Sequence, residues 1–435
     1  MSREARMRPT QLGVGTLVGW STRIGLGTLV FGGLFVYGSS TGLSWAKTLY
    51  AGSIFVIGSL TIPTSLRTEL LRKDGRGIQL VSILLLSSLS IGTVLGPIPD
   101  AAEALRQGLF YLLVPLAPFI GIGLGARLTN RFVSALVLIA GILSAISFGV
   151  DWLTRRQVGS LDVGRIVFGS PVLSALGFAL AAVLSVHGRR LIRLLATAAV
   201  VIIPVSLLVT GTRTDLIIFL VPFALIGARR NLRLSASNTF WVLILCIASI
   251  GLLVLVAPLL LQDPSFLQVR ADGLAQVLSG YAQSDQSFVI RSLQYEYAYS
   301  NFQRSPLFGM GFGWVPEMSL DTPVAIPARV GIIGTMLLLV FLIQCLALVR
   351  RAGARYGPNP FNPAALGLGV FIVALIPFGA PIEDHGFAIA LVALFAGIAS
   401  RIPSEAPYVG QPMTTGARST APTSTSRAVR PGHSL

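Results

Sequence analysis

Long apolar segments alternate with short polar segments along most of the chain. A helix that crosses a bilayer needs about 20 predominantly apolar residues, and about twelve segments approach or meet this criterion. The residues show no two-residue alternation of the kind that a membrane β-barrel requires. The pattern therefore predicts an all-α, polytopic membrane protein with about twelve transmembrane helices. The predicted spans cover residues 20–41, 45–64, 78–96, 108–126, 132–153, 170–187, 194–211, 215–228, 238–261, 329–349, 365–382 and 386–400.

The basic residues between these segments predict an orientation. They gather in every second connection, so that one set of connections holds roughly twice as many as the other. Short cytoplasmic loops carry such an excess of Lys and Arg, which predicts that both termini are cytoplasmic. The basic clusters on the predicted cytoplasmic side lie near residues 3–8, 67–76, 127–131, 189–193, 229–233, 350–355 and 401–430.

One predicted outer connection is much longer than the others. Residues 262–328 separate the ninth and tenth predicted spans, and a connection of that length is usually functional. Within it, residues 287–304 place apolar, aromatic and basic side chains at near-helical spacing, which predicts an amphipathic helix on the membrane face. The side chains that set this spacing are Phe288, Arg291, Leu293, Tyr295, Tyr299 and Phe302.

The composition agrees with a membrane protein and excludes other classes. Hydrophobic residues make up 53% of the chain and charged residues 11%, whereas a soluble domain carries about 25% charged residues. The net charge of +16 comes from clusters that flank the apolar segments, so no nucleic-acid partner is expected. Residues 402–435 are rich in Ser, Thr, Pro and Ala, which predicts a disordered cytoplasmic tail after a membrane domain over 1–401.

The sequence carries no familiar motif for metal or cofactor chemistry. Its three histidines are scattered and its two cysteines lie inside apolar segments. The motifs of zinc proteases, phosphate-binding loops and serine nucleophiles are absent. The glycines of F-G-M-G-F-G at 308–313 are spaced like a dinucleotide loop, but no strand precedes them. We therefore expect neither a metal nor a cofactor.

Arginines on the predicted outer side are the candidate functional groups. Arg213, in G-T-R-T-D, lies in a turn so short that its guanidinium stays close to membrane depth, where a cation is costly and a functional candidate. It either extends to the interface and pairs with Asp215 or binds an anionic headgroup, because the guanidinium fork matches phosphate oxygens. Arg291, with Glu296 nearby, and Arg165, alone in its loop, extend the argument. Three converging arginines would suit a lipid pyrophosphate.

Three further stretches have a recognisable order and spacing. L-L-V-T-G-T-R-T-D-L-I-I-F-L-V-P-F-A-L at 207–225 is a small-residue turn with an arginine that opens an apolar helix. R-I-V-F-G-S-P-V-L-S-A-L-G at 165–177 leads into a span through an aromatic residue and a proline. The third stretch runs from Arg291 through R-S-P-L-F-G-M-G-F-G at 304–313 to R-V-G-I-I-G at 329–334. Together with the long loop between spans nine and ten, these stretches resemble the O-antigen ligase and Wzy-type polysaccharide polymerase superfamily.

The resemblance implies a membrane glycosyltransferase with its active face outside the plasma (inner) membrane. The donor would be a glycan on a polyprenyl pyrophosphate. A hydroxyl of an acceptor glycan or lipid-linked sugar would attack the donor's anomeric carbon, with inversion. Arg213 and Arg291 would be catalytic by stabilising the leaving pyrophosphate, and membrane lipid would be a further partner. The residues expected to help bind the substrates are Arg165, Asp215, Glu296 and Tyr295.

One position departs from the family's ligase pattern. Ligases of this family carry a histidine and a polar residue, followed by nine residues before a Gly-x-x-Gly. Counting back from Gly331 places Leu320 at the histidine position and Asp321 at the polar one. The missing histidine favours a polymerase over a ligase. It also means that a carboxylate would have to accept the proton of the acceptor hydroxyl. Glu317 and Asp321 are the first candidates for this base, and Glu296 is the third.

Two other functions are compatible with the sequence. A multi-pass transporter or a flippase of lipid-linked glycans would have a similar number of spans, and a non-catalytic assembly protein would keep the lipid-binding residues. Transporters tend to place ionisable residues near the bilayer midplane. In this chain nearly every charge lies at the end of a predicted helix, which favours an enzyme that acts at the outer surface.

Overall fold

A computed structural model of the chain describes most of the predicted helical regions. The described residues are 20–32, 44–71, 75–96, 101–157, 171–187, 190–209, 286–356, 359–375 and 387–402, together with a few positions between 240 and 251. Within these ranges, residues 69, 313, 315–316 and 319–321 are not described. The predicted span 215–228, most of 238–261 and the tail from 403 onward therefore lie outside the described residues.

Every regular element in the described part of the chain is a helix, as the apolar pattern predicts. Each of them except α13 coincides with a stretch that was predicted to span the membrane. Residues 20–32 are also helical. The bounds are α2 Ser44–Leu66, α4 Arg76–Leu95, α5 Ala101–Gly125, α6 Asn130–Gln157, α7 Pro171–His187, α8 Arg190–Val209, α13 Gln286–Arg304, α14 Ala325–Tyr356, α15 Phe361–Leu375 and α17 Phe387–Arg401.

Several of these helices have the length and apolar character of membrane spans. Arg76–Leu95, Asn130–Ser147 and Ala325–Ala354 are long and apolar enough to cross a bilayer, and shorter apolar helices accompany them. Large apolar side chains also cover the outside of the bundle. Val94 is 78% exposed and Ile343 is 62% exposed, which is favourable next to lipid and unfavourable in water. The total of about twelve spans stays a prediction.

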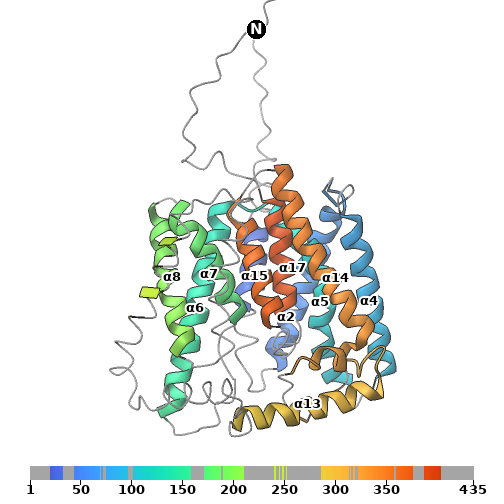
Figure 1. The fold of residues 1–435 in the computed structure, drawn as a ribbon. Helices are drawn as coiled ribbons and strands as arrows, with labels where there is room; N and C mark the ends of the chain where they lie inside the picture. The colour runs from blue at the N-terminus through green and yellow to red at the C-terminus, as the bar shows by residue number, and fades with distance from the viewer. Residues whose placement is uncertain are drawn as a thin grey trace, which may run out of the picture.

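The helices stand side by side in one bundle, with α17 packed among the others (Figure 1). Every residue of α17 from Phe387 to Ser400 is buried. Glycines bring α17 against α5, because a Cβ atom on Gly121 would lie 2.1 Å from the Leu394 carbonyl oxygen and one on Gly397 would lie 2.3 Å from the Pro118 carbonyl oxygen. Close approach through small residues is a common basis of helix association in membranes.

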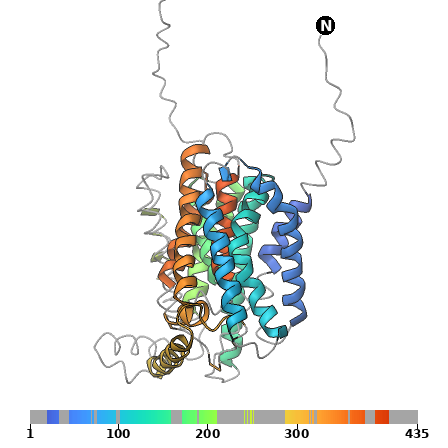
Figure 2. The ribbon, with the colours of Figure 1, turned by 90° about the vertical axis from the view of Figure 1, so that its right-hand side faces the viewer.

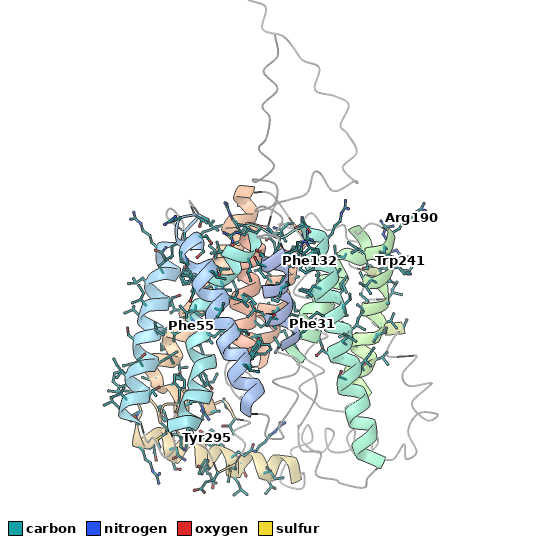
Figure 3. All side chains as sticks on the ribbon, turned by 180° about the vertical axis from the view of Figure 1, so that it is seen from behind. Phe31, Phe55, Phe132, Arg190, Trp241 and Tyr295 are labelled. Atoms are coloured by element: carbon teal, nitrogen blue, oxygen red, sulfur yellow. The ribbon has the colours of Figure 1, made fainter. Side chains whose placement is uncertain are left out.

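Helix ends and the short connections between them gather arginines at one end of the bundle. Asn359 fixes the start of α15 at this end, because its Oδ1 accepts hydrogen bonds from the backbone N–H groups of Phe361 and Asn362, each at 3.0 Å. Its Nδ2 donates to the Ala399 carbonyl near the end of α17, at 3.0 Å. Figure 3 shows Arg190 at this end and Tyr295 at the opposite end. The arginine-rich end carries Arg67, Arg76, Arg127, Arg131, Arg190, Arg193, Arg350, Arg351 and Arg401.

Candidate active site at the α13 end of the bundle

Helix α13 runs across the end of the bundle opposite the arginine-rich end (Figure 1). The helix predicted over 287–304 is therefore present, and it begins one residue earlier, at Gln286. Figure 2 shows α13 nearly end-on, next to the adjacent end of α14. Gln294, Ala298 and Asn301 are its buried positions. The exposed apolar and aromatic side chains of α13 are Val289, Ile290, Leu293, Tyr295 and Tyr299.

The segment that follows α13 is hydrogen-bonded into a break in α14. The backbone of Gly331 leaves the helical conformation, with φ 70° and ψ 178°. The amides of Ile332 and Ile333, just after the break, donate to the carbonyls of Pro306 and Leu307, at 2.9 and 3.2 Å. The carbonyls of Ala328 and Arg329, just before it, accept from the amides of Met310 and Gly311, at 2.8 and 2.9 Å. Residues 306–311, named here the glycine turn, thus complete the hydrogen bonding of α14.

Three positions in this interlock require glycine. Gly309, Gly311 and Gly331 have φ values of 73°, 74° and 70°, a left-handed region that side chains with a Cβ atom rarely adopt. There is also no space for a Cβ atom. One on Gly331 would lie 2.1 Å from the Leu307 carbonyl oxygen, and one on Gly311 would lie 2.3 Å from the Gly92 carbonyl oxygen of α4. Gly309 and Gly311 of the F-G-M-G-F-G motif therefore allow the turn to dock between α4 and α14.

A buried arginine lies beside the glycine turn. The guanidinium carbon of Arg329 lies 5.6 Å from the centre of the Trp314 ring and 5.9 Å from the centre of the Tyr111 ring. The Tyr111 ring stacks on Phe312, with ring centres 4.4 Å apart, and the Trp314 ring stacks on Tyr297, with ring centres 6.1 Å apart. We call these five residues the aromatic–arginine stack. In the sequence, Arg329 opens the R-V-G-I-I-G motif at 329–334 but was not predicted to be a site residue.

Three of the predicted site residues lie on α13. Arg291 is partly buried, whereas Glu296 and Tyr295 are exposed. Arg291 and Tyr295 are four positions apart, so their side chains share one side of the helix. Glu296 is five positions from Arg291, whereas helical side chains meet at spacings of three or four. The Tyr295 ring lies nearly parallel to that of Tyr299, with centres 6.0 Å apart. A cation and a pair of aromatic rings thus occupy one helix at this end of the bundle.

Glu317 is held next to α13 by its backbone. Its amide donates a hydrogen bond to the Tyr297 hydroxyl at 3.1 Å, and its side chain is exposed. The candidate base and the helix that carries Arg291 are therefore connected through Tyr297. Four predicted site residues, Arg165, Arg213, Asp215 and Asp321, lie outside the described residues. In the part of the chain that the structure describes, no group of three or more His, Cys, Asp or Glu residues is arranged to hold a metal ion.

In the part of the chain that the structure describes, the apolar bundle and the helix across its end are those of an α-helical integral membrane protein. The sequence model of a family described as O-antigen ligase matches residues 198–330, a range that contains α13, the glycine turn and Arg329. This match supports the resemblance to the superfamily of O-antigen ligases and Wzy-type polymerases that the motifs predict. A comparison with curated proteins finds no match.

Proposed function

We propose that this membrane enzyme joins a glycan carried on a polyprenyl pyrophosphate to a hydroxyl of an acceptor sugar, and that it acts as a polymerase rather than a ligase. The observation that carries the proposal is the family match over residues 198–330, whose C-terminal part is the segment that docks α13 onto the bundle. The absence of a histidine at Leu320 favours the polymerase.

The proposed reaction needs positive charge at the leaving group and a base at the acceptor. The acceptor oxygen forms a bond to the anomeric carbon while the bond from that carbon to the pyrophosphate oxygen breaks. The electron pair leaves with the pyrophosphate, and the acceptor's proton passes to a carboxylate. Arg213 and Arg291, with Arg165, stabilise the charge that develops on the pyrophosphate. Attack from the side opposite the leaving group inverts the anomeric carbon.

The exposed side of α13 fits a position at the membrane surface. Val289, Ile290 and Leu293 are between 43% and 54% exposed, and the Tyr295 and Tyr299 rings lie on the same helix. Tyrosines and aliphatic side chains favour the interface between lipid and water. This position supports the proposal that Arg291 contacts the pyrophosphate of a lipid-linked donor and that the Tyr295 ring offers a face to a sugar.

Reconstitution tests the proposed function directly. The purified chain in liposomes should convert a polyprenyl-pyrophosphate-linked oligosaccharide into longer lipid-linked glycans and release polyprenyl pyrophosphate. Products on a different lipid acceptor would identify a ligase instead. Movement of intact donor across the bilayer without any new glycosidic bond would contradict the enzyme and support a flippase.

The proposed orientation places α13 outside the cell and the arginine-rich end in the cytoplasm. Single cysteines at Met318 and Arg350 are suitable probes because both positions are exposed, after Cys246 and Cys345 have been replaced by alanine. A membrane-impermeant thiol reagent added to intact cells should label Met318→Cys and should label Arg350→Cys only after the membrane is opened. The reverse pattern would place the proposed active face in the cytoplasm.

Glu317 and Asp321 are the proposed proton acceptors. Glu317→Gln or Asp321→Asn removes basicity with little change in shape, so turnover should fall at least about tenfold for the residue that serves as the base. Binding of the lipid-linked donor, measured separately, should be unchanged. If both amide variants turn over normally, Glu296 becomes the candidate to replace in the same way.

A further inference from the structure

The aromatic–arginine stack joins parts of the chain that lie far apart in the sequence. Tyr111 belongs to α5, Arg329 to α14 and Tyr297 to α13, while Phe312 and Trp314 follow the glycine turn. The guanidinium of Arg329 and the four rings lie in successive contact, with separations of 4.4 to 6.1 Å between neighbours. The stack therefore connects the helix that carries Arg291 to the bundle.

Arg329 is buried in this contact. Only 4% of its surface is exposed, as is also the case for Tyr111, and Trp314 is 6% exposed. A buried cation is costly unless its surroundings replace water, and the faces of aromatic rings attract a cation electrostatically. The planar guanidinium can also present two faces to two rings, which an ammonium group on a flexible stem cannot do. The site thus suits arginine specifically.

The backbone of Arg329 takes part in the same attachment. Its carbonyl accepts the hydrogen bond from the Gly311 amide at 2.9 Å, so one residue holds the glycine turn through its backbone and the rings through its side chain. Trp314 also belongs to a small buried apolar cluster, in which Ala298 of α13 packs with Ala325 and Ala328 at the start of α14. The backbone contacts do not depend on the guanidinium.

We propose that Arg329 is a positioning residue, whose guanidinium links Trp314 to Tyr111 and thereby fixes α13 and the backbone of Glu317 on the bundle. The link to the reaction rests on the proposed function. Trp314 stacks on Tyr297, Tyr297 accepts the hydrogen bond from the Glu317 amide, and Arg291 lies on the same helix as Tyr297. Loss of the guanidinium leaves the glycine turn docked but lets α13 move, and misplacement by about 1 Å can cost about a hundredfold in rate.

Hydrogen exchange and kinetics on the full-length protein test this role. In Arg329→Gln, amides of α13 should exchange at least about tenfold faster, whereas those of α17 should keep their protection. The kcat should fall at least about tenfold, with a change in KM for the donor of less than about threefold. Arg329→Lys keeps the charge and should be intermediate in both measurements. Arg304→Gln, an exposed position at the end of α13, is the matched control and should resemble the wild type.

The outcomes separate the positioning role from the proposed function. Unchanged exchange in α13 would overturn the positioning role, whatever the activity. Faster exchange in α17 as well would show that Arg329 supports the whole fold, which also overturns it. Faster exchange in α13 with normal kcat would show that the position of α13 does not limit the reaction. An inactive wild type would remove the proposed function while the exchange measurement still tests the attachment.

A second variant removes the Tyr111 ring, which lies next to the Arg329 guanidinium, and keeps the arginine. Tyr111→Leu should loosen α13 in the same way as Arg329→Gln, because both break the link between α5 and Trp314. The double variant should exchange little faster than either single variant, since residues that act through one contact are not additive. If the increases in the exchange rate of the two single variants multiply in the double variant, Tyr111 and Arg329 act separately. This result would overturn the proposal that the aromatic–arginine stack positions α13.

Discussion

Arg291→Ala is expected to abolish glycan transfer while the protein still inserts at the wild-type level. An arginine that stabilises charge on the leaving pyrophosphate contributes mainly in the transition state, and loss of such a group typically lowers kcat by about a hundredfold to a thousandfold. Arg213→Ala should behave in the same way. Arg291→Lys should rescue only part of the activity, because an ammonium group cannot form two parallel hydrogen bonds with phosphate oxygens. Product formation and membrane content are the two measurements.

The control for this prediction lies on the same helix. Arg304→Ala removes a positive charge from the exposed end of α13 and should leave the transfer rate within about twofold of the wild type. Equal losses in Arg291→Ala and Arg304→Ala would indicate a general effect of charge at the membrane surface. Normal product from Arg291→Ala would remove this residue from the mechanism.

Gly331→Ala is expected to undo the interlock between the glycine turn and α14. The new Cβ atom would lie 2.1 Å from the Leu307 carbonyl oxygen, and the residue has φ 70°. Steric overlap and an unfavourable backbone conformation each cost about 1 to 3 kcal/mol, so the free energy of unfolding should fall by about 2 kcal/mol or more. Thermal unfolding in detergent measures the change as a lower Tm.

Gly52→Ala is the matched control for this substitution. Gly52 lies in α2, where a Cβ atom would meet nothing within 4 Å. Alanine has a higher helix propensity than glycine, so this variant should unfold at the same temperature as the wild type or slightly above it. A similar loss of stability at both positions would mean that the left-handed conformation and close approach at Gly331 are not the cause.

The positions of most described helices could be predicted from the sequence because apolar length alone identifies them. The predicted segments 45–64 and 78–96 correspond to α2 and α4 within a few residues. The start of α14 was harder to predict. It begins at Ala325, four residues before the predicted start, because Pro327 is tolerated in the first turn of a helix, where amides have no helical partner.

The site was only partly predictable. The spacing of the aromatic and apolar residues over 287–304 correctly predicted α13 and thereby the location of Arg291, Glu296 and Tyr295. The role of Arg329 could not be found in this way, because its contact with Tyr111 depends on how α5 and α14 pack and leaves no periodic pattern. The motif around Gly331 was recognised as a family feature, whereas the left-handed conformation that explains it became visible only in the structure.

The break at Gly331 has a consequence for how the protein enters the membrane. A bilayer offers no water to amides and carbonyls that lack helical partners, and the groups on either side of this break find partners in the glycine turn. The end of α14 is therefore expected to be stable in lipid only together with residues 306–311. We expect insertion of this helix and docking of the preceding segment to be coupled, so a substitution in the glycine turn should lower the yield of inserted protein.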